Sequence, residues 1–278
     1  MDKIDKIRDS IIQHGKDSDR VYLLKYHDDE PLSLIQQLNK FCSENGYGKV
    51  IAKVPGQASP YFLLDGYVQE AFIPGFFRGG KNVFFMAKYF DEERSTLDKK
   101  NLDVFSVQLS GKSGIDEIML PPDCDFKITS PQNCEEMAGL YRAVFETYPF
   151  PIHDPEYLRQ TMKHGEVMYF GVWKRDQLVA LSSAEIDAVN FNAEMTDFAV
   201  LPEMRGNKLG RFLLQKMEDE MVLLGYKTLY TIARLQSPGM NKTFLDQGYL
   251  FSGLLKNNTN ISGQIESMNV YYKNIQKW

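Results

Sequence analysis

The clearest chemical signal in the sequence is a glycine-bearing loop between a predicted strand, residues 193–200, and a predicted helix, residues 206–224. The first N–H groups of a helix have no partner inside the helix, and the helix dipole adds partial positive charge there. Glycine lets the backbone approach a ligand closely. Such a loop suits a pyrophosphate, although an ordinary strand–turn–helix joint is the alternative. The candidate binding residues are Phe198, Ala199, Val200, Arg205, Gly206, Asn207, Lys208, Leu209, Gly210 and Arg211.

Periodicity and capping signals predict the elements that place this loop. Two helices open with a capping residue followed by proline, at Ser130-Pro131 and Asp154-Pro155, and extend to about residues 147 and 165. We expect strands over residues 167–173, 178–186, 193–200, 228–233, 249–255 and 267–273, and a short helix over residues 239–247. The fold class that follows is α/β, with a mixed sheet in a domain spanning residues 126–278.

The predicted helix after the loop is amphipathic. Apolar residues recur on one face of it, at Leu209, Phe212, Leu213, Met217, Met221 and Leu224. The opposite face carries Arg211, Gln215, Glu218 and Asp219. We therefore expect this helix to pack its apolar face on the sheet and to leave its N-terminus at the loop.

Residues 1–90 repeat the order of features found near the C-terminus. Gly46-Tyr47 and Gly66-Tyr67 are separated by 20 residues, and Gly225-Tyr226 and Gly248-Tyr249 by 23. In each copy a helical pattern precedes the first pair and a strand with a tyrosine, Tyr89 or Tyr272, closes the copy. We expect residues 1–90 to form a smaller, partial copy of the C-terminal fold. Residues 27–32 contain no glycine, so that copy should lack the phosphate loop.

The segment between the two copies has the composition of a connection. A polar run begins at Asp91, and a Pro121-Pro122 pair follows. Residues 91–125 are therefore expected to link the domains, with a short strand near residues 104–109. The aromatic run over residues 72–77 is expected to pack between the two halves.

Composition excludes several classes of protein. The 278 residues are 43% hydrophobic and 25% charged, which excludes wholesale disorder. A net charge of −5 without a basic block argues against nucleic acid, and no apolar stretch reaches the roughly 18 residues of a membrane span. The N-terminus lacks a secretory signal, so we expect a cytoplasmic protein whose three cysteines are free thiols. The four histidines have no ligand spacing, and no metal is expected.

The loop resembles the acetyl-CoA loop of the GNAT acetyltransferases, Arg/Gln-x-x-Gly-x-Gly/Ala. Arg205 and Gly210 stand at its first and last positions, whereas Lys208 replaces the central glycine. The resemblance implies a GNAT fold, acetyl-CoA as co-substrate and a small-molecule amine as acceptor. It also implies that Asn241 lies beside the pantetheine arm and that the Val200 N–H stabilises the oxyanion. Enzymes of this family are often dimers, so a homodimer is compatible with the resemblance.

Two further stretches resemble the beta-lysine N-acetyltransferases. The first is Ala71-Phe-Ile-Pro-Gly-Phe-Phe-Arg-Gly79 with Phe84-Phe-Met-Ala-Lys-Tyr-Phe90. The second is Asn257-Asn-Thr-Asn-Ile261 with Glu266-Ser-Met-Asn-Val270. Since the strings lie in both halves, the resemblance covers nearly the whole chain. It implies acetylation of the side-chain amine of beta-lysine to give the compatible solute N6-acetyl-beta-lysine.

Such an acceptor needs a base, because a lysine-type amine has a pKa of about 10.4 and holding it neutral at pH 7 costs about 4.6 kcal/mol. Glu194 matches the position of the base in several GNAT enzymes. Asp197, Asp187 and Glu185 are its competitors, and any of them, or Glu266, could instead bind the second ammonium group. Candidates for binding the substrate carboxylate are Arg142, Arg159 and Arg234.

The general acid that often serves this family is missing. Phe244 stands where the usual tyrosine would protonate the leaving thiolate, and Tyr249 or Tyr271 are possible substitutes. Two other functions stay open at this point. One is acetylation of a different amine, such as a polyamine or a protein lysine. The other is a CoA-binding regulatory module without catalysis, which the departures at Lys208 and Phe244 would suit.

Overall fold

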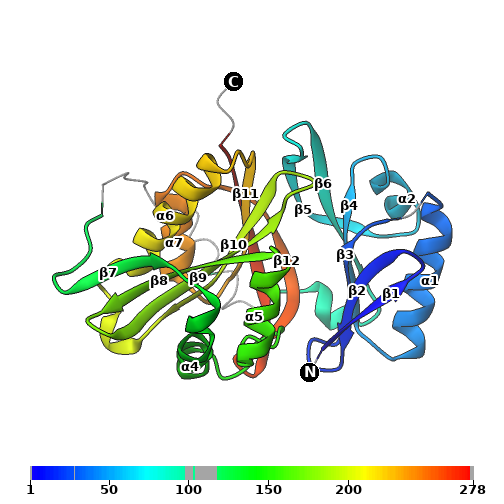
Figure 1. Cartoon of the computed structure of the whole chain (residues 1–278). Coiled ribbons are helices and arrows are strands. Elements are labelled where there is room, and N and C mark those ends of the chain that lie inside the picture. Colours follow the sequence, from blue (N-terminus) through cyan, green and yellow to red (C-terminus); the bar gives the residue numbers. More distant parts are fainter. Residues whose placement is uncertain (1, 28, 98–102, 104–117, 276–278) are drawn as a thin grey trace.

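A computed structural model describes residues 2–27, 29–97, 103 and 118–275. Its strands form one 13-stranded sheet in the order β1-β2-β3-β4-β6-β5-β12-β13-β11-β10-β9-β8-β7. The N-terminal half (residues 3–95) and the C-terminal half (residues 124–274) occupy opposite ends of this sheet and meet where β5 pairs with β12 (Figure 1). No helix within the described ranges is long and apolar enough to cross a membrane.

The C-terminal half has helices on both faces of its strands (Figure 1). The strands are β7 (Cys124–Ile128), β8 (Val167–Lys174), β9 (Gln177–Asp187), β10 (Asn192–Val200), β11 (Thr228–Arg234), β12 (Leu250–Ile261) and β13 (Gln264–Asn274). The helices are α4 (Cys134–Val144), α5 (Pro155–Lys163), α6 (Leu209–Leu223) and α7 (Pro238–Asp246), with short 3-10 turns η2 (Pro131–Asn133) and η3 (Pro202–Met204). These elements confirm the predicted mixed α/β fold.

Several predicted boundaries in this half were wrong. The helix expected from residue 206 begins at Leu209, and the last strand, expected from residue 267, begins at Gln264. The helix expected over residues 131–147 is a 3-10 turn followed by α4, which ends at Val144. Strand β12 continues to Ile261, well beyond the expected end at residue 255, because a bulge lets the strand resume its pairing with β13 at Thr259.

The N-terminal half repeats the connectivity of the C-terminal half. It contains β1 (Lys3–Ile7), β2 (Ser10–Gly15), β3 (Arg20–Lys25), α1 (Pro31–Glu44), β4 (Lys49–Pro55), α2 (Ser59–Leu64), β5 (Val68–Phe77), β6 (Lys81–Tyr89) and the turn η1 (Glu92–Ser95). β3 and β4 are parallel, as are β10 and β11. β4, β6 and β5 then pair antiparallel in that order, as do β11, β13 and β12. We therefore propose that residues 1–90 are a partial copy of the C-terminal domain.

The strand register corrects one detail of the sequence repeat. Val68 lies opposite Ala87, and Leu250, which holds the matching place after a Gly-Tyr pair, lies opposite Tyr272. Ala87 is thus the counterpart of Tyr272, whereas Tyr89 lies two residues further on and pairs with Lys49. The segment expected as a short strand, residues 104–109, lies outside the described residues.

Helix α6 buries most of its predicted apolar face. Leu209, Leu213 and Met217 are buried in the core between α6 and the sheet, together with Phe212 and Met221. Leu224 is 48% exposed because α6 ends before it, so its predicted burial was wrong. The cysteines that the structure describes are free thiols, as expected.

A separate core joins the two halves. It holds Ile73 and Phe76 from β5, with Tyr22 from β3, against Tyr230 and Met268 of the C-terminal half. The rings of Phe76 and Tyr230 lie 5.2 Å apart, centroid to centroid. The aromatic run thus packs between the halves as predicted, although Phe72, at one end of it, is 37% exposed and stacks on Phe84.

Buried cations reinforce this junction. Arg20 donates to the carbonyl of Asn258 and the hydroxyl of Thr259, both at 2.8 Å. Arg94, in the run expected to be a linker, is only 6% exposed and bridges Asp19 to the Asn257 carbonyl. The Asn257–Ile261 string therefore receives side chains from the N-terminal half at the bulge in β12.

Gly253 makes the closest backbone approach at this junction. It has φ +155°, and a Cβ there would lie 2.1 Å from the Glu70 carbonyl oxygen. We expect Gly253→Ala to lower the free energy of unfolding by about 2 kcal/mol or more, because backbone must move. Urea denaturation measures this. Gly139→Ala, in the open interior of α4, is the control and should leave stability unchanged or raise it; equal behaviour of the two variants would contradict the close approach.

Candidate active site

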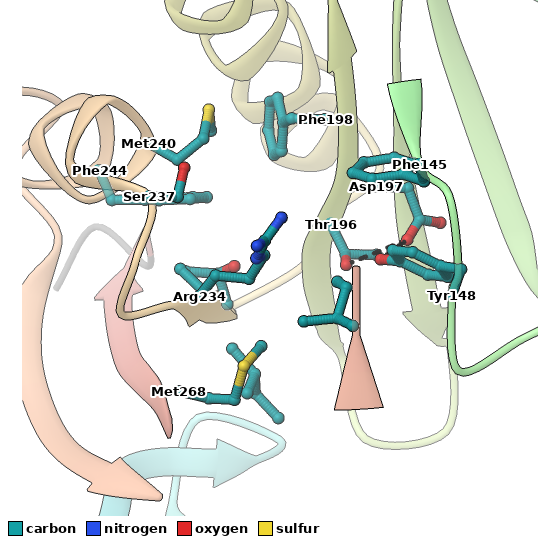
Figure 2. A pocket seen from close by; sticks show the side chains of 14 residues that line it. Phe145, Tyr148, Thr196, Asp197, Phe198, Arg234, Ser237, Met240, Phe244 and Met268 are labelled. Atoms are coloured by element: carbon teal, nitrogen blue, oxygen red, sulfur yellow. Dashed lines mark hydrogen bonds between the residues drawn. The ribbon is translucent and has the colours of Figure 1, made fainter. Parts of the chain in front are cut away.

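The parallel pairing between β10 and β11 is interrupted in the middle of the C-terminal half. It covers only Asn192–Glu194 against Thr228–Tyr230. A bulge between Thr196 and Ala199, with Asp197 at φ +55°, then shifts the register of β10 against β9. Beyond this point residues of both strands line an open cavity, which Figure 2 shows from close by.

The cavity has an apolar side and a polar side. Phe198, Met240 and Phe244 form the side next to α6 and α7 (Figure 2). Tyr148, Thr196, Asp197 and Arg234 supply polar groups elsewhere on the wall. A cavity with this lining could hold a largely aliphatic chain that carries amide groups.

A backbone N–H points into the opening between the strands. The Leu201 N–H donates to the Val179 carbonyl of β9 at 3.0 Å. Successive N–H groups of a strand point to opposite edges, so the N–H of Val200 faces the gap toward β11. This is the geometry that stabilisation of an oxyanion by Val200 requires.

The loop leads directly into the N-terminus of α6. Gly206 has φ +86° and Lys208, which precedes the first helical residue, has φ +57°. Both conformations favour glycine, which explains why the related motif has glycine where this chain has Lys208. The N–H groups at the start of a helix have no acceptor inside it, so those of Leu209 and Gly210 in the first turn of α6 can face an anion.

The predicted cofactor-binding residues differ in whether their side chains are exposed or buried. Arg205, Asn207 and Lys208 are exposed around the loop. In contrast, the side chains of Ala199, Leu209 and Arg211 are at most 9% exposed, so these residues can offer a cofactor little besides their backbone. Phe198 lines the cavity with its ring.

Asn241 is fully buried, and its amide is occupied within the chain. Its Nδ2 donates to the carbonyls of Arg234 and Ser237 at 2.8 and 2.7 Å. Its Oδ1 accepts from Asn269 and from the Tyr271 hydroxyl. Asn241 thus anchors the start of α7 to β11 and β13, and its contact with a cofactor stays a prediction.

Carboxylates gather on the opposite face of β10 from α6. Ala193 and Met195 are buried beneath α6, so Glu194 and Thr196 point the other way. Glu185 lies directly opposite Glu194 on β9. Glu194 itself does not line the cavity, but Thr196, two residues along on the same face, does.

The environment raises the pKa of each acid in this group. Burial raises the pKa of Glu194, while the charge of Lys53 and a hydrogen bond from the Tyr230 hydroxyl lower it again in part. Burial and then the negative charges of Glu194 and Asp197 raise the pKa of Glu185, whose side chain still reaches solvent. A carboxylate with a raised pKa is a stronger base, which suits proton abstraction from an amine.

Asp197 is held by its neighbours at the bulge. It accepts hydrogen bonds from Ser183 Oγ at 2.5 Å and from the Tyr148 hydroxyl. Burial nonetheless raises its pKa. These contacts fix the bulge, and binding of a substrate ammonium by Asp197 stays a prediction. Asp187, another predicted competitor, accepts from the backbone of Val189 and Asn190 and so caps the turn before β10.

The other predicted substrate residues already have partners within the chain. Arg234 and Glu266 form two hydrogen bonds, Nε–Oε2 at 2.9 Å and Nη2–Oε1 at 2.6 Å. Arg142 donates to the carbonyl of His153, and Arg159 pairs with Glu156 on the surface. Glu266 is buried in its pair, so its binding to a substrate ammonium would require that the pair opens.

The predicted substitutes for the missing acid lie in the core. Tyr249 is 2% exposed, and Tyr271 is fully buried and donates to Asn241. Burial raises the pKa of Tyr271 to about 12 and also raises that of Tyr249 well above its ordinary value. Phe244 packs against both rings. None of the three groups offers a ready proton to a leaving thiolate.

Sequence reasoning missed the residues that surround Glu194 from the N-terminal half. Lys53 Nζ lies 3.5 Å from the hydroxyl of Tyr230, and Tyr22 packs in the same inter-half core. A signal existed for Lys53, because it is the charged residue inside the otherwise apolar run Val50-Ile-Ala-Lys-Val54. A charge at that place in a strand indicates a polar partner across the core face.

The chain is similar to one protein-family model and to several known proteins. Residues 134–249 match the model of the acetyltransferase (GNAT) family. The chain is 40% identical to the beta-lysine N(6)-acetyltransferase of Methanococcus maripaludis, over 98% of this chain and 99% of that protein. It is 29% identical to the protein of the same name from Methanosarcina mazei, covering 81% and 90% of the two chains. It is 27% identical to the N-acetyltransferase YodP of Bacillus subtilis, covering 96% of each. The chain therefore belongs to the GNAT acetyltransferase family and is an N-acetyltransferase.

Proposed function

We propose that this enzyme transfers the acetyl group of acetyl-CoA to the side-chain amine of beta-lysine, giving N6-acetyl-beta-lysine. The observation that carries the proposal is the 40% identity to a beta-lysine N(6)-acetyltransferase over nearly the full length of both chains. Enzymes of the GNAT family use acetyl-CoA. Membership of the family does not by itself identify the amine substrate, so the identity of the acceptor needs a direct test.

The loop and the cavity support a single path for the cofactor. The pyrophosphate would contact the loop at residues 205–208 and the N–H groups of Leu209 and Gly210. The pantetheine arm would follow the cavity between β10 and β11, past Phe198 and Met240. Its thioester would then reach the Val200 N–H, beside the acids on the far face of β10.

We propose that the acetyl group passes directly from acetyl-CoA to the amine, on the face of β10 that carries Glu194. Glu194 takes a proton from the substrate ammonium, directly or through a water molecule. The neutral amine attacks the thioester carbonyl, so a C–N bond forms and the Val200 N–H stabilises the oxyanion. The attached nitrogen then loses its second proton to solvent, the C–S bond breaks, and the CoA thiolate leaves and takes up a proton from solvent. No tyrosine acid is required, because a thiolate is a good leaving group.

A panel of acceptors tests the function. Beta-lysine, alpha-lysine, spermidine and a lysine-containing peptide would each be offered with acetyl-CoA to the purified enzyme. We expect the kcat/KM for beta-lysine to be at least about tenfold above the others, which corresponds to about 1.4 kcal/mol. A higher kcat/KM for spermidine or the peptide would identify that amine as the acceptor in place of beta-lysine. Binding of CoA without any turnover would favour the regulatory module instead.

Glu194→Gln tests the base. We expect kcat to fall by about 10²- to 10⁴-fold while the affinity for acetyl-CoA stays within about twofold. In the wild type, activity should fall as the pH drops through the raised pKa of Glu194, because the protonated carboxyl cannot accept a proton. That acidic limb should be absent in the variant. Glu185→Gln is the matched control across the strand pair; a larger loss there would transfer the role to Glu185.

Gly210→Asp tests the phosphate site. The added carboxylate would stand in the first turn of α6, where bound phosphates would be repelled. We expect the acetyl-CoA dissociation constant, measured by calorimetry, to rise about tenfold or more. Gly210→Ala is the control, because its Cβ would meet only Met240 Sδ at an ordinary 3.5 Å. Unchanged acetyl-CoA affinity in Gly210→Asp would mean that the loop only connects β10 to α6 and does not bind the phosphates.

Lys208→Gly tests the conformation of the loop. Lysine pays a steric cost at φ +57° that glycine avoids. We therefore expect the free energy of unfolding to rise by about 0.5–1 kcal/mol, in spite of the greater entropy of glycine in the unfolded chain. Lys216→Gly, inside α6, should instead lower it by about 1 kcal/mol. Destabilisation by both substitutions would show that the ammonium of Lys208 stabilises the fold.

A further inference from the structure

The N-terminal half places a lysine, Lys53, near the acids of β9 and β10, Glu185 and Glu194, where the acceptor is proposed to bind. Lys53 lies on β4, on the face that packs against the C-terminal half, since its neighbours Ala52 and Val54 are buried in the core on the other side of the strand. Its Nζ lies 3.5 Å from the Tyr230 hydroxyl. It also lies 5.7 Å from the ring centres of Phe76 and Tyr230. Tyr230 in turn hydrogen-bonds to Glu194.

This ammonium is poorly compensated. Within the described part of the chain, no carboxylate lies within 4.0 Å of it, and its hydrogen bond to Tyr230 is long. Burial lowers the pKa of Lys53, whereas the charges of Glu194, Glu185 and Asp187 raise it and that of Lys25 lowers it. A half-buried cation without a close anion costs free energy that a bound anion would recover.

The other candidate cations are already engaged or lie in solvent. Arg234 is held by Glu266 through two hydrogen bonds. Arg142 and Arg159 have partners outside the cavity. Lys25 is exposed. Lys53 is therefore the cation best placed to meet an anionic group of an acceptor whose amine lies at Glu194.

We propose that Lys53 binds the carboxylate of the acceptor and so makes the enzyme select an amino acid over a simple diamine. This inference rests on the proposed function. In beta-lysine a chain of five carbons separates the carboxylate from the amine that is acetylated, so the two ends can reach Lys53 and Glu194 at the same time. The second ammonium group would lie near Glu185. A diamine or polyamine would bring another positive charge against Lys53 and leave its ammonium unpaired.

A pair of acceptors isolates this contact. Pentane-1,4-diamine is beta-lysine without its carboxylate, and it would be compared with beta-lysine in the wild type, Lys53→Met and Lys53→Arg. We expect Lys53→Met to lower kcat/KM for beta-lysine, mainly through KM, and to lower the ratio of this value to the kcat/KM for the diamine by about 10- to 100-fold, because only beta-lysine loses an attractive contact. Lys53→Arg should retain more of the activity on beta-lysine. Acetyl-CoA affinity and thermal stability are measured on each variant.

Two outcomes overturn the proposal. Equal losses on both acceptors would mean that Lys53 acts through Tyr230 on Glu194, and Tyr230→Phe should then cause the same loss. Unchanged activity on beta-lysine would mean that no carboxylate binds there. Failure of the proposed function looks different, because the wild type would then not acetylate beta-lysine. If it acetylates alpha-lysine instead, alpha-lysine and pentane-1,5-diamine form the equivalent pair, and the same ratio decides the role of Lys53.

Discussion

The site depends on one interruption in the sheet, the early end of parallel pairing between β10 and β11. Strand hydrogen bonds normally use every backbone group on both edges, which would leave no room between two neighbouring strands. Here the pairing stops at Glu194, and the bulge at Asp197 turns the following residues away. The gap leaves β10 beyond Glu194 unpaired on the side of β11, and the loop before α6 follows β10 directly in the chain. Hydrogen bonds from Ser183 and Tyr148 to Asp197 hold the bulge in place.

We propose that the cofactor and the acceptor bind on different faces of β10 at this interruption. Residues that point toward α6 form the apolar core, while Glu194 and Thr196 point to the face that the N-terminal half approaches. The acids there are close enough to raise one another's pKa. Their shared charge suits a cationic acceptor, and the cation at Lys53 makes the face bipolar. A bipolar face matches a molecule that carries both ammonium and carboxylate groups.

The two halves share one strand connectivity but carry different side chains at equivalent positions. Arg20 and Asn192 hold equivalent places in the two parallel pairs, so Tyr22 of the N-terminal half corresponds to Glu194. An aromatic ring thus stands where the C-terminal half has its acid. The face of the N-terminal strands that carries Tyr22, Ile51 and Phe85 packs against β11, β12 and β13. The N-terminal half therefore completes the core of its neighbour, and the polar seam at Asn257 and Asn258 fixes its orientation.

Local sequence determined the strands and helices of the C-terminal half, the loop and the position of Glu194, because periodicity, capping and glycine placement act over a few residues. It also indicated the repeat, through the Gly-Tyr pairs that close corresponding helices. Only the tertiary structure decided which polar groups meet. Arg234 and Glu266 each looked available to substrate and instead satisfy one another, and the amide of Asn241 is used in the core. Lys53 reaches Tyr230 across 177 positions of sequence. Such contacts arise when distant segments pack together, and a local pattern can indicate that a polar partner exists but not which residue it is.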